Sequence, residues 1–340
     1  MIYPKFITKN STIGITAPSD GKIDKLDLIR LDNAYNKLKR LGYNIKETSS
    51  VRTSINGRSN TAKNRALELE ELFNDKNIDI IISASGGEFM MEILPYLNFN
   101  IIKNNPKWFC GYSDNTTLGF ILPTIFDIAS IYSDNISAFG MNKWHQSINN
   151  YLDIITGNII TQKSFSKYQS TYQDYITGLE SYNLDKPVSW TNLTGQKEIK
   201  LEGRLIGGCL DVLLTLVGTK YDKVSRFINK YKNDGIVWFL ESCDLSSEQI
   251  IRGLWQLKEA GWFKYSKGFI FGRTITKKTY TNTSYEEAIL TSLKDLNIPI
   301  IIDSDFGHTN PRLTIINGCY TKIISKNGKG EITQIIKEID

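Results

Sequence analysis

The stretch Ile78-Asp-Ile-Ile-Ile-Ser83 decides the fold class of this chain. It is a short, nearly continuous run of β-branched residues, which is typical of a strand buried on both faces of a parallel sheet. Gly86-Gly87 follows and ends the strand, and the apolar residues of 89–97 return to helical spacing. The order of strand, turn and helix predicts one unit of an α/β fold.

Units of the same kind lie on both sides of this stretch. The apolar run 12–17 ends in a turn signal at Pro18-Ser19-Asp20-Gly21. The spacing of apolar residues predicts helices over 31–41, 66–73 and 115–126, and strands over 43–47, 107–110 and 128–132. Repeated strand–helix units imply a parallel sheet covered on both faces and joined by right-handed crossovers.

Composition changes near residue 145. The region 145–200 is rich in Ser, Thr, Tyr, Asn and Gln, and only 188–193 resembles an irregular strand. A second α/β segment follows, with strands predicted at 197–205, 235–241, 268–274 and 299–302 and helices at 210–217, 246–260 and 285–296. We therefore predict an N-terminal domain over 1–145, a connecting segment over 146–195 and a C-terminal domain over 196–340.

Size and composition are those of an ordinary globular protein. A chain of 340 residues is long for one hydrophobic core, and 41% hydrophobic with 23% charged residues is a common balance. The net charge of +5 comes from lysines spread along the chain, without a dense basic stripe. This pattern argues against a nucleic-acid partner.

The N-terminus and the cysteines bear on the cellular compartment. No long apolar segment follows a basic start, and no stretch approaches the length of a bilayer span, so we expect neither a signal peptide nor a membrane partner. The four cysteines at positions 110, 209, 243 and 319 are scattered and form no CxxC pair. We therefore predict a cytoplasmic protein without a disulfide framework, a metal or a cofactor.

Histidine is scarce, which narrows the search for an acid–base group. Only His145 and His308 are present, and histidine is the usual proton shuttle near neutral pH. His308 stands in Asp305-Phe-Gly-His-Thr-Asn-Pro-Arg312, in a loop after a predicted strand, where α/β proteins keep working groups. His145 lies in the polar connection without a comparable setting. We favour His308 as a general base; a histidine bonded structurally in a turn is the alternative.

A candidate nucleophile stands where a short strand meets a helix. The phrase Phe109-Cys-Gly-Tyr-Ser-Asp-Asn-Thr-Thr117 places Ser113 after Gly111, which leaves room for a sharp turn. The helix that follows points backbone N–H groups at the site, which suits an oxyanion. The pattern lacks the second glycine of the usual nucleophile elbow, and Ser113 or Asp114 as a helix cap is the alternative. Cys110 falls inside the predicted strand, where a thiol is buried and inert.

A candidate carboxylate closes the apolar run 236–240. Glu241 at the end of a buried strand is partly desolvated and needs a partner. Orienting a histidine is one such role. Pairing with a lysine or arginine, or capping the helix that begins near Ser246, is the alternative, and Asp244 and Glu248 are nearby rivals. Ser, Glu and His in this order indicate a serine hydrolase.

Two further loops follow predicted strands. Ser85-Gly86-Gly87-Glu88 suits an oxyanion or carboxylate site, and it is no phosphate-binding loop because neither GxGxxG nor GxxxxGK[ST] surrounds it. Pro18-Ser19-Asp20 lies at the edge where open parallel sheets contact ligands, although an ordinary turn explains it equally well. The pair Gly207-Gly208 indicates a close approach of two backbones.

Together these phrases resemble peptidase family S66, the LD-carboxypeptidases and the microcin C self-immunity hydrolases. The resemblance extends over nearly the whole chain. It is carried by six phrases in the family's order: Gly14-Ile-Thr-Ala-Pro-Ser19, Gly86-Gly87 with Leu94-Pro-Tyr-Leu97, Gly111-Tyr-Ser-Asp-Asn-Thr116, Gly203-Arg-Leu-Ile-Gly-Gly208, Phe239-Leu-Glu241, and Phe306-Gly-His-Thr-Asn-Pro311.

The resemblance implies roles and an architecture. Ser113 would be the nucleophile, Glu241 the orienting acid and His308 the base, with the backbone N–H groups of Gly87 and Asp114 as the oxyanion hole. It further implies a flavodoxin-like N-terminal parallel-sheet domain, a mixed α/β C-terminal domain, an active site between them, and a homodimer.

Two departures from the family's pattern lie near the expected substrate. Carboxypeptidase members often carry Arg-Gly-Gly-Tyr-Gly where this chain has Ala84-Ser-Gly-Gly-Glu-Phe89, and members usually have Asn where this chain has Cys209. Neither change removes Ser113, Glu241 or His308. The departures therefore bear on the substrate more than on the mechanism.

The sequence thus predicts a serine hydrolase of an amide bond, first an LD-carboxypeptidase that releases terminal D-alanine from a muropeptide tetrapeptide. One alternative is an immunity-type hydrolase of toxic aminoacyl-nucleotides, in which Trp190 or Trp144 stacks on adenine; a place in the core explains a tryptophan in this region equally well. The second alternative is a non-catalytic peptide-binding α/β protein. In each case the partner is a small peptide or peptidyl-nucleotide, and the predicted substrate contacts are Ser19, Gly86, Glu88 and Trp190.

Overall fold

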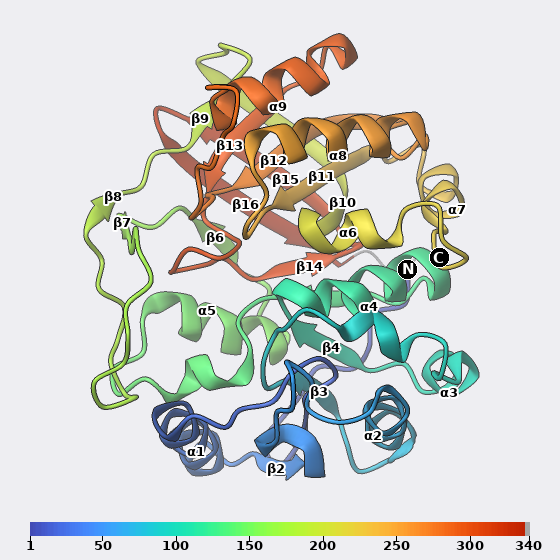
Figure 1. The fold of residues 1–340 in the computed structure, drawn as a ribbon, viewed down its shortest axis with the longest axis vertical. Helices are drawn as coiled ribbons and strands as arrows, with labels where there is room; N and C mark the ends of the chain where they lie inside the picture. The colour runs from blue at the N-terminus through green and yellow to red at the C-terminus, as the bar shows by residue number, and fades with distance from the viewer. Residues whose placement is uncertain (337–340) are drawn as a thin grey trace.

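The computed structural model describes residues 1–336, which form two β-sheets with helices packed around each (Figure 1). In Figure 1 the sheet built from the N-terminal strands occupies the lower half and the second sheet the upper half. The predicted α/β fold class is confirmed. Its two parts are a parallel-rich N-terminal sheet domain and a mixed α/β C-terminal domain.

The first sheet has the strand order β14-β5-β4-β3-β1-β2. All pairs are parallel except β14 with β5. The parallel order 2-1-3-4-5 is the flavodoxin-like arrangement. The isoleucine run supplies the inner strand β3, of which every residue is buried. The strands are β1 (Thr12–Thr16), β2 (Asn44–Glu47), β3 (Ile80–Ser83), β4 (Trp108–Gly111), β5 (Ser130–Tyr132) and β14 (Ile315–Asn317).

The second sheet has the order β6-β16-β15-β10-β11-β12-β13-β9. Its middle strands β10 to β13 are parallel to one another, and antiparallel strands extend both edges. A separate ribbon pairs β7 with β8. The strands are β6 (Thr161–Lys163), β7 (Lys167–Tyr168), β8 (Lys186–Pro187), β9 (Thr191–Asn192), β10 (Glu198–Cys209), β11 (Ile236–Glu241), β12 (Ser266–Gly272), β13 (Ile300–Ser304), β15 (Tyr320–Lys326) and β16 (Lys329–Ile335).

Helices follow the strands in both parts. The α-helices are α1 (Lys25–Arg40), α2 (Ala62–Asn74), α3 (Phe99–Asn104), α4 (Thr116–Ile121), α5 (Gln146–Ile155), α6 (Leu210–Leu216), α7 (Val224–Lys230), α8 (Ser247–Glu259) and α9 (Tyr285–Leu293). Short 3₁₀ turns are η1 (Ser49–Arg52), η2 (Met90–Ile93), η3 (Ser113–Asn115), η5 (Ile136–Gly140) and η6 (Lys294–Leu296), and η4 (Leu122–Phe126) is a π turn. None of the helices within residues 1–336 combines the length and apolar character that a membrane crossing requires.

The region predicted as a plain connection contains more structure than expected. Helix α5 begins at its start and buries Ile148, Tyr151, Ile154 and Ile155 in the core. These residues do have helical spacing, which the polar residues around them obscured. Strand β9 lies within the predicted irregular strand at 188–193. The domain boundaries at 145 and 195 stay a prediction, and β14 crosses them by joining the first sheet.

The two parts meet along helix α4 and the end of β10. The backbone N–H of Cys209 donates to Thr116 Oγ1 at 3.1 Å, and one hydrophobic cluster includes buried residues of both sheets. Because β3, β4, β11 and β13 all end toward this junction, the loops that follow them lie together. In open α/β sheets such a crevice at the carboxyl ends of the strands is where ligands bind.

Candidate active site

Ser113 lies at the end of β4, at the first residue of the short turn η3 that leads into α4. Its backbone has φ of +63°, in the left-handed region that non-glycine residues rarely occupy. Outliers of this kind gather at functional sites, and a nucleophile elbow holds its serine on such a sharp turn. The sequence did not reveal this conformation, because the second glycine of the elbow pattern is absent.

Ser113, His308 and Glu241 form a continuous hydrogen-bonded chain, which we call the relay. His308 Nε2 lies 3.0 Å from Ser113 Oγ, and His308 Nδ1 lies 2.7 Å from Glu241 Oε2. With a neutral imidazole, Nδ1–H donates to the carboxylate and Nε2 accepts from the hydroxyl. The structure thus brings together three side chains that the sequence places 195 and 67 positions apart.

Glu241 is held from two sides. It is 1% exposed at the end of β11, and the hydroxyl of Tyr132 donates to Glu241 Oε1 while His308 uses Oε2. Gly307 lies directly over the carboxylate: with φ of +95°, a Cβ at this position would come within 2.8 Å of Glu241 Oε2. A larger residue at 307 would therefore displace the acid or the loop that carries His308.

Burial and charge act in opposite directions on this pair. Burial by itself lowers the pKa of His308, but the adjacent Glu241 carboxylate outweighs it and raises that pKa well above the usual value. Burial likewise opposes ionisation of Glu241, yet the His308 charge and hydrogen bond hold the pKa of Glu241 below its usual value. The attraction between the two charges, which outweighs burial, thus favours the charged pair over the neutral pair, and His308 acts as a base once it has lost that proton.

The Gly86-Gly87 loop faces the hydroxyl of Ser113. A Cβ on Gly86 would lie 3.1 Å from Ser113 Oγ, so only glycine leaves space there for another atom. No backbone or side-chain acceptor within residues 1–336 bonds the N–H groups of Gly87 and Asp114. Free N–H groups beside a partly exposed serine are the donors that an oxyanion requires.

Asp114 and Asn115 tie this loop to the Ser113 turn. The Asp114 carboxylate accepts from Met90 N at 2.7 Å and from Ser19 Oγ at 2.5 Å. Asn115 Nδ2 donates to the carbonyl of Ser85 at 2.9 Å. Sequence reasoning missed the role of Asn115, since an Asn in the first turn of a helix is ordinary and its partner is 30 residues away.

Two predicted substrate contacts require correction. Ser19 is fully buried, and its hydroxyl is used by Asp114 and by Phe89 N, so it supports the loop and does not reach a substrate. Trp190 is 2% exposed, its indole N–H donates to Asp305 Oδ2 at 2.7 Å, and its ring covers Gly330. Trp190 therefore has no free face on which an adenine could stack.

Glu88 lies at the crevice, whereas Trp144 and His145 have structural partners elsewhere. Glu88 is exposed, and burial of part of its side chain together with the charge of Asp114 raises its pKa. Its pKa also responds to His308, which places Glu88 at the same crevice. Trp144 donates to the Phe139 carbonyl, and His145 caps α5 through Ser147 N. The rival histidine is thus a helix cap.

Tyr132 is a further site residue that sequence reasoning missed. It ends β5, it is 4% exposed, and its hydroxyl is shared between Glu241 and the backbone of Ser113. A tyrosine at the end of a short β-branched strand carries no signal of such a role. Only the neighbouring strand order β4-β5 brings it beside Ser113.

Three groups at this site could also ligate a metal ion. Ligand atoms of Cys209, Glu241 and His308 lie within 4.8 Å of one another. Glu241 and His308 are already engaged with each other, and burial raises the pKa of the Cys209 thiol well above its usual value, which favours the protonated form. Since a metal binds the thiolate, this arrangement favours the relay over a metal centre.

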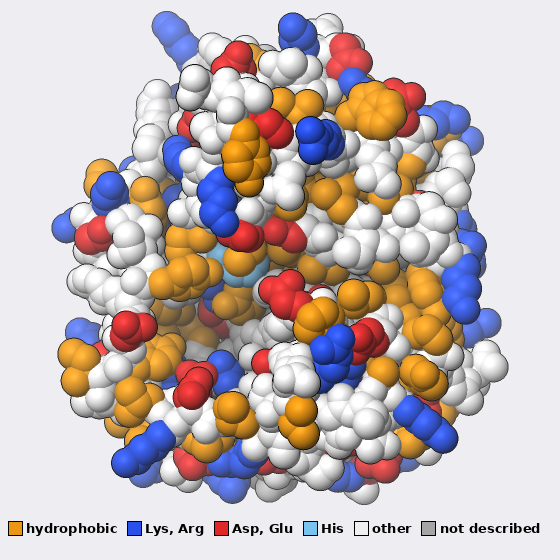
Figure 2. Space-filling view, in the orientation of Figure 1, with side chains coloured by type: hydrophobic (Ala, Val, Ile, Leu, Met, Phe, Trp, Pro, Cys, Tyr) orange, Lys and Arg blue, Asp and Glu red, His pale blue; other side chains and the backbone are white. Residues whose placement is uncertain are grey.

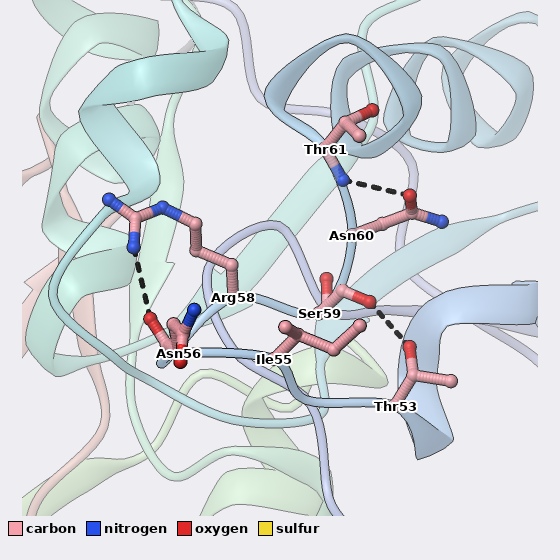
Figure 3. Close-up of a pocket in the computed structure, with 7 residues that line it drawn as sticks. All are labelled: Thr53, Ile55, Asn56, Arg58, Ser59, Asn60 and Thr61. Carbon is pink, nitrogen blue, oxygen red and sulfur yellow. Dashed lines mark hydrogen bonds between the residues drawn. The ribbon is translucent and has the colours of Figure 1, made fainter.

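The relay opens on a hollow between the two parts of the molecule. Figure 2 shows this hollow with a histidine side chain at its centre and hydrophobic side chains along its wall. A separate hollow of about 500 Å³ is formed by the loop 53–61 (Figure 3). There the polar groups bond one another, as Asn60 Oδ1 does with Thr61 N, and Arg58 pairs with Glu92. The second hollow offers no acid–base pair.

A hydroxyl, an imidazole and a buried carboxylate joined in this order, beside free backbone N–H groups, are the arrangement that acyl-transfer hydrolases use. The sequence profiles of the S66 peptidases agree with it: the LD-carboxypeptidase N-terminal domain matches residues 13–133, and the LD-carboxypeptidase C-terminal domain matches residues 202–323. The chain belongs to peptidase family S66.

The chain is similar both to proteins named as carboxypeptidases and to self-immunity proteins. A probable murein peptide carboxypeptidase of Bacillus subtilis is 25% identical over 92% of this chain and 88% of its own length. The microcin C7 self-immunity protein MccF of Escherichia coli is 28% identical over 82% of this chain and 80% of its own. The crystal structure of an MccF-like protein from Bacillus anthracis superposes with a TM-score of 0.83 at 26% identity, covering 99% of this chain and 100% of that one.

Proposed function

We propose that this chain is a serine hydrolase that cleaves an amide bond, with the muropeptide tetrapeptide as its first substrate. The bond cleaved is the L-to-D peptide bond that releases terminal D-alanine. The observation that carries the proposal is the relay, in which a hydroxyl, an imidazole and a buried carboxylate are hydrogen-bonded in sequence. Membership of a family of peptidases that includes carboxypeptidases supports the same reading.

In the proposed mechanism, His308 Nε2 accepts the proton of Ser113 as Oγ attacks the scissile carbonyl carbon. The carbonyl oxygen takes up the negative charge and accepts hydrogen bonds from the N–H groups of Gly87 and Asp114. Glu241 stabilises the imidazolium that forms. His308 then gives its proton to the leaving nitrogen as the carbon–nitrogen bond breaks, and a water molecule repeats the sequence on the acyl-enzyme.

The supporting residues act through position. Tyr132 and Gly307 fix the carboxylate, and Asn115 and the Asp114 carboxylate fix the Gly86-Gly87 loop against the Ser113 turn. Since oxyanion donors are effective only when they are preorganised, this network belongs to the proposed mechanism although it touches no substrate.

A second candidate function is hydrolysis of a toxic aminoacyl-nucleotide. The similarity to the self-immunity protein MccF favours it. The burial of Trp190 opposes the version of this function in which that indole stacks on the base. A non-catalytic peptide binder is the third reading, and it has no need of a relay.

Product analysis tests these readings together. Purified protein is incubated separately with a muropeptide tetrapeptide and with a peptidyl-nucleotide antibiotic, and products are read by mass spectrometry. Release of D-alanine by the wild type and not by Ser113→Ala is the expected result, with the exposed serine variant Ser225→Ala as the matched control. Release of the aminoacyl group from the nucleotide alone would select the second function. Failure of a fluorophosphonate to label Ser113, with no turnover of either compound, would favour the binder.

A further inference from the structure

A small cavity lies beside the relay, with Tyr112 in its wall. It has a volume of about 130 Å³, and its wall includes residues from six separate regions of the chain. We call it the Arg30 cavity and define it by Lys22, Arg30, Tyr112, Asp134, Tyr182 and Arg312.

The Tyr112 ring contacts both the wall of the cavity and the base. The Arg312 guanidinium lies 4.0 Å from the centre of this ring, and the imidazole of His308 lies 5.3 Å from it, centre to centre. Arg312 Nε also donates to the carbonyl of Gly307, next to His308, at 2.8 Å. Tyr112 and Arg312 therefore line the cavity and also contact the loop that carries the base, which places the cavity next to the relay.

The cavity holds a cation without a carboxylate partner. Arg30 is 4% exposed, and its guanidinium donates only to two backbone carbonyls, at 3.0 Å for Gly178 and 2.9 Å for Glu180. No carboxylate oxygen within residues 1–336 lies in ion-pair distance of it. Arg312, in contrast, is paired with Asp134. The charge of Arg30 acts on Asp134 from a distance, but Asp134 forms its ion pair with Arg312. A buried guanidinium without an ion pair of its own, in the wall of a cavity, indicates an anionic ligand.

Unsatisfied polar atoms lie in the same wall. Ser137 Oγ and Asn310 Oδ1 are buried and have no hydrogen-bond partner among residues 1–336, and both residues line the cavity. Buried polar atoms are nearly always bonded, and leaving one unsatisfied is costly. An acceptor and a hydroxyl beside an unpaired cation match a ligand that carries both an N–H donor and an anion.

The volume limits what that ligand is. Sites for drug-sized ligands measure roughly 300 to 1,000 Å³, so a cavity of about 130 Å³ admits a fragment such as one small amino acid and excludes a nucleoside. We propose that the Arg30 cavity binds the terminal amino acid that the hydrolase releases, with its α-carboxylate on the Arg30 guanidinium. The inference rests on the proposed function and extends it by assigning the leaving-group subsite.

Two peptides separate the carboxylate from the rest of the substrate. The first is the tetrapeptide with a free terminal D-alanine, and the second is the same tetrapeptide with a C-terminal amide. The wild type is expected to favour the free acid in kcat/KM by about 30-fold or more, the size of a charge-assisted hydrogen-bonded contact. Arg30→Gln is expected to lose that factor on the acid while its rate on the amide stays within about threefold.

Two further variants control for damage to the fold. Arg226 also donates to a backbone carbonyl, that of Ile125 at 3.2 Å, but lies on α7 away from the cavity, so Arg226→Gln should keep the wild-type preference. Arg30→Lys keeps the charge and should restore part of the preference for the acid. Equal losses on both peptides in Arg30→Gln would mean that Arg30 only supports the carbonyls of 178 and 180, which overturns the proposal.

A binding measurement decides the subsite without turnover. Calorimetry of Ser113→Ala with D-alanine and with D-alaninamide should detect binding of the acid only, and the added Arg30→Gln substitution should abolish it. Binding of both compounds alike, or of neither, overturns the subsite. Absence of hydrolysis of any peptide by the wild type would instead count against the proposed function, so the two failures are distinguishable.

Discussion

The relay and the Arg30 cavity both adjoin Tyr112, and they differ in how far their polar groups are hydrogen-bonded. In the relay every side chain has a partner: Ser113 bonds His308, His308 bonds Glu241, and Glu241 also accepts from Tyr132. In the cavity, Arg30 forms no ion pair and two buried polar atoms have no hydrogen-bond partner within the part of the chain that the structure describes.

This contrast separates the preorganised relay from the cavity, whose polar groups a ligand would bond. A satisfied network is preorganised, so changes in it should affect the chemical step and not the recognition of one end of the substrate. Changes in the wall of the Arg30 cavity should affect recognition of that end of the substrate and not the chemical step. The following changes test this division, beginning with those that should lower activity the most.

Removing either end of the proton path should have the largest effect. Ser113→Ala and His308→Gln are each expected to lower kcat by about a thousandfold or more, because neither the attack nor the proton transfer has a substitute. Steady-state kinetics on the tetrapeptide measure this, with circular dichroism to verify folding. The double variant should lose no more than either single one, since the two groups act as a unit. Additive losses would show that the contact between them is not used in catalysis.

Glu241→Gln should lower kcat by about a hundredfold or more and also move the pH profile. Burial lowers the pKa of His308, but the Glu241 carboxylate raises it by more, so the wild-type base loses its proton only well above the usual histidine range. The rate of the wild type should therefore rise with pH through that high pKa. With the carboxylate gone and burial retained, the midpoint should shift to lower pH. An unchanged midpoint would contradict the proposed coupling of the pair.

Tyr132→Phe should have a moderate effect on the same step. It removes the hydroxyl that bonds Glu241 and the backbone of Ser113 but keeps the ring in the core. A loss of about fivefold to tenfold in kcat, with KM unchanged, is expected for one hydrogen bond. A rise in KM alone would mean that Tyr132 acts in substrate recognition, as the cavity does, and would contradict its assignment to the relay.

Chelation should have the smallest effect. The proposed mechanism uses no metal, so treatment with EDTA should leave kcat/KM within about twofold. Ligand atoms of Cys209, Glu241 and His308 lie close enough to bind an ion, which makes the measurement informative. A loss of activity that Zn²⁺ restores, and that Cys209→Asn prevents, would replace the relay by a metal centre.

The pattern of apolar residues predicted most of the fold. The isoleucine run became the buried strand β3, and the strand–helix repeats became a sheet of flavodoxin-like order. Helix α5 was missed because polar residues dilute its apolar face. Strand β14 could not be predicted as part of the first sheet, since three residues give no signal of the strand against which they pair.

Some residues of the candidate site could be predicted from the sequence and others could not. Ser113, Glu241 and His308 were found because each follows a predicted strand and carries a reactive group. Trp190 was assigned to the substrate because exposure cannot be read from a tryptophan in a polar segment, and it is buried.

Most of the strands and helices, and the reactive groups Ser113, Glu241 and His308, could be read from the sequence, because hydrophobic periodicity and residue chemistry are local properties. Tertiary structure alone decided the left-handed backbone at Ser113, the bond from Tyr132 to Glu241, and the unpaired Arg30. The physical reason is that partnership between polar groups depends on packing: Tyr132 and Glu241 are 109 positions apart, and only the docking of two sheets brings them into contact.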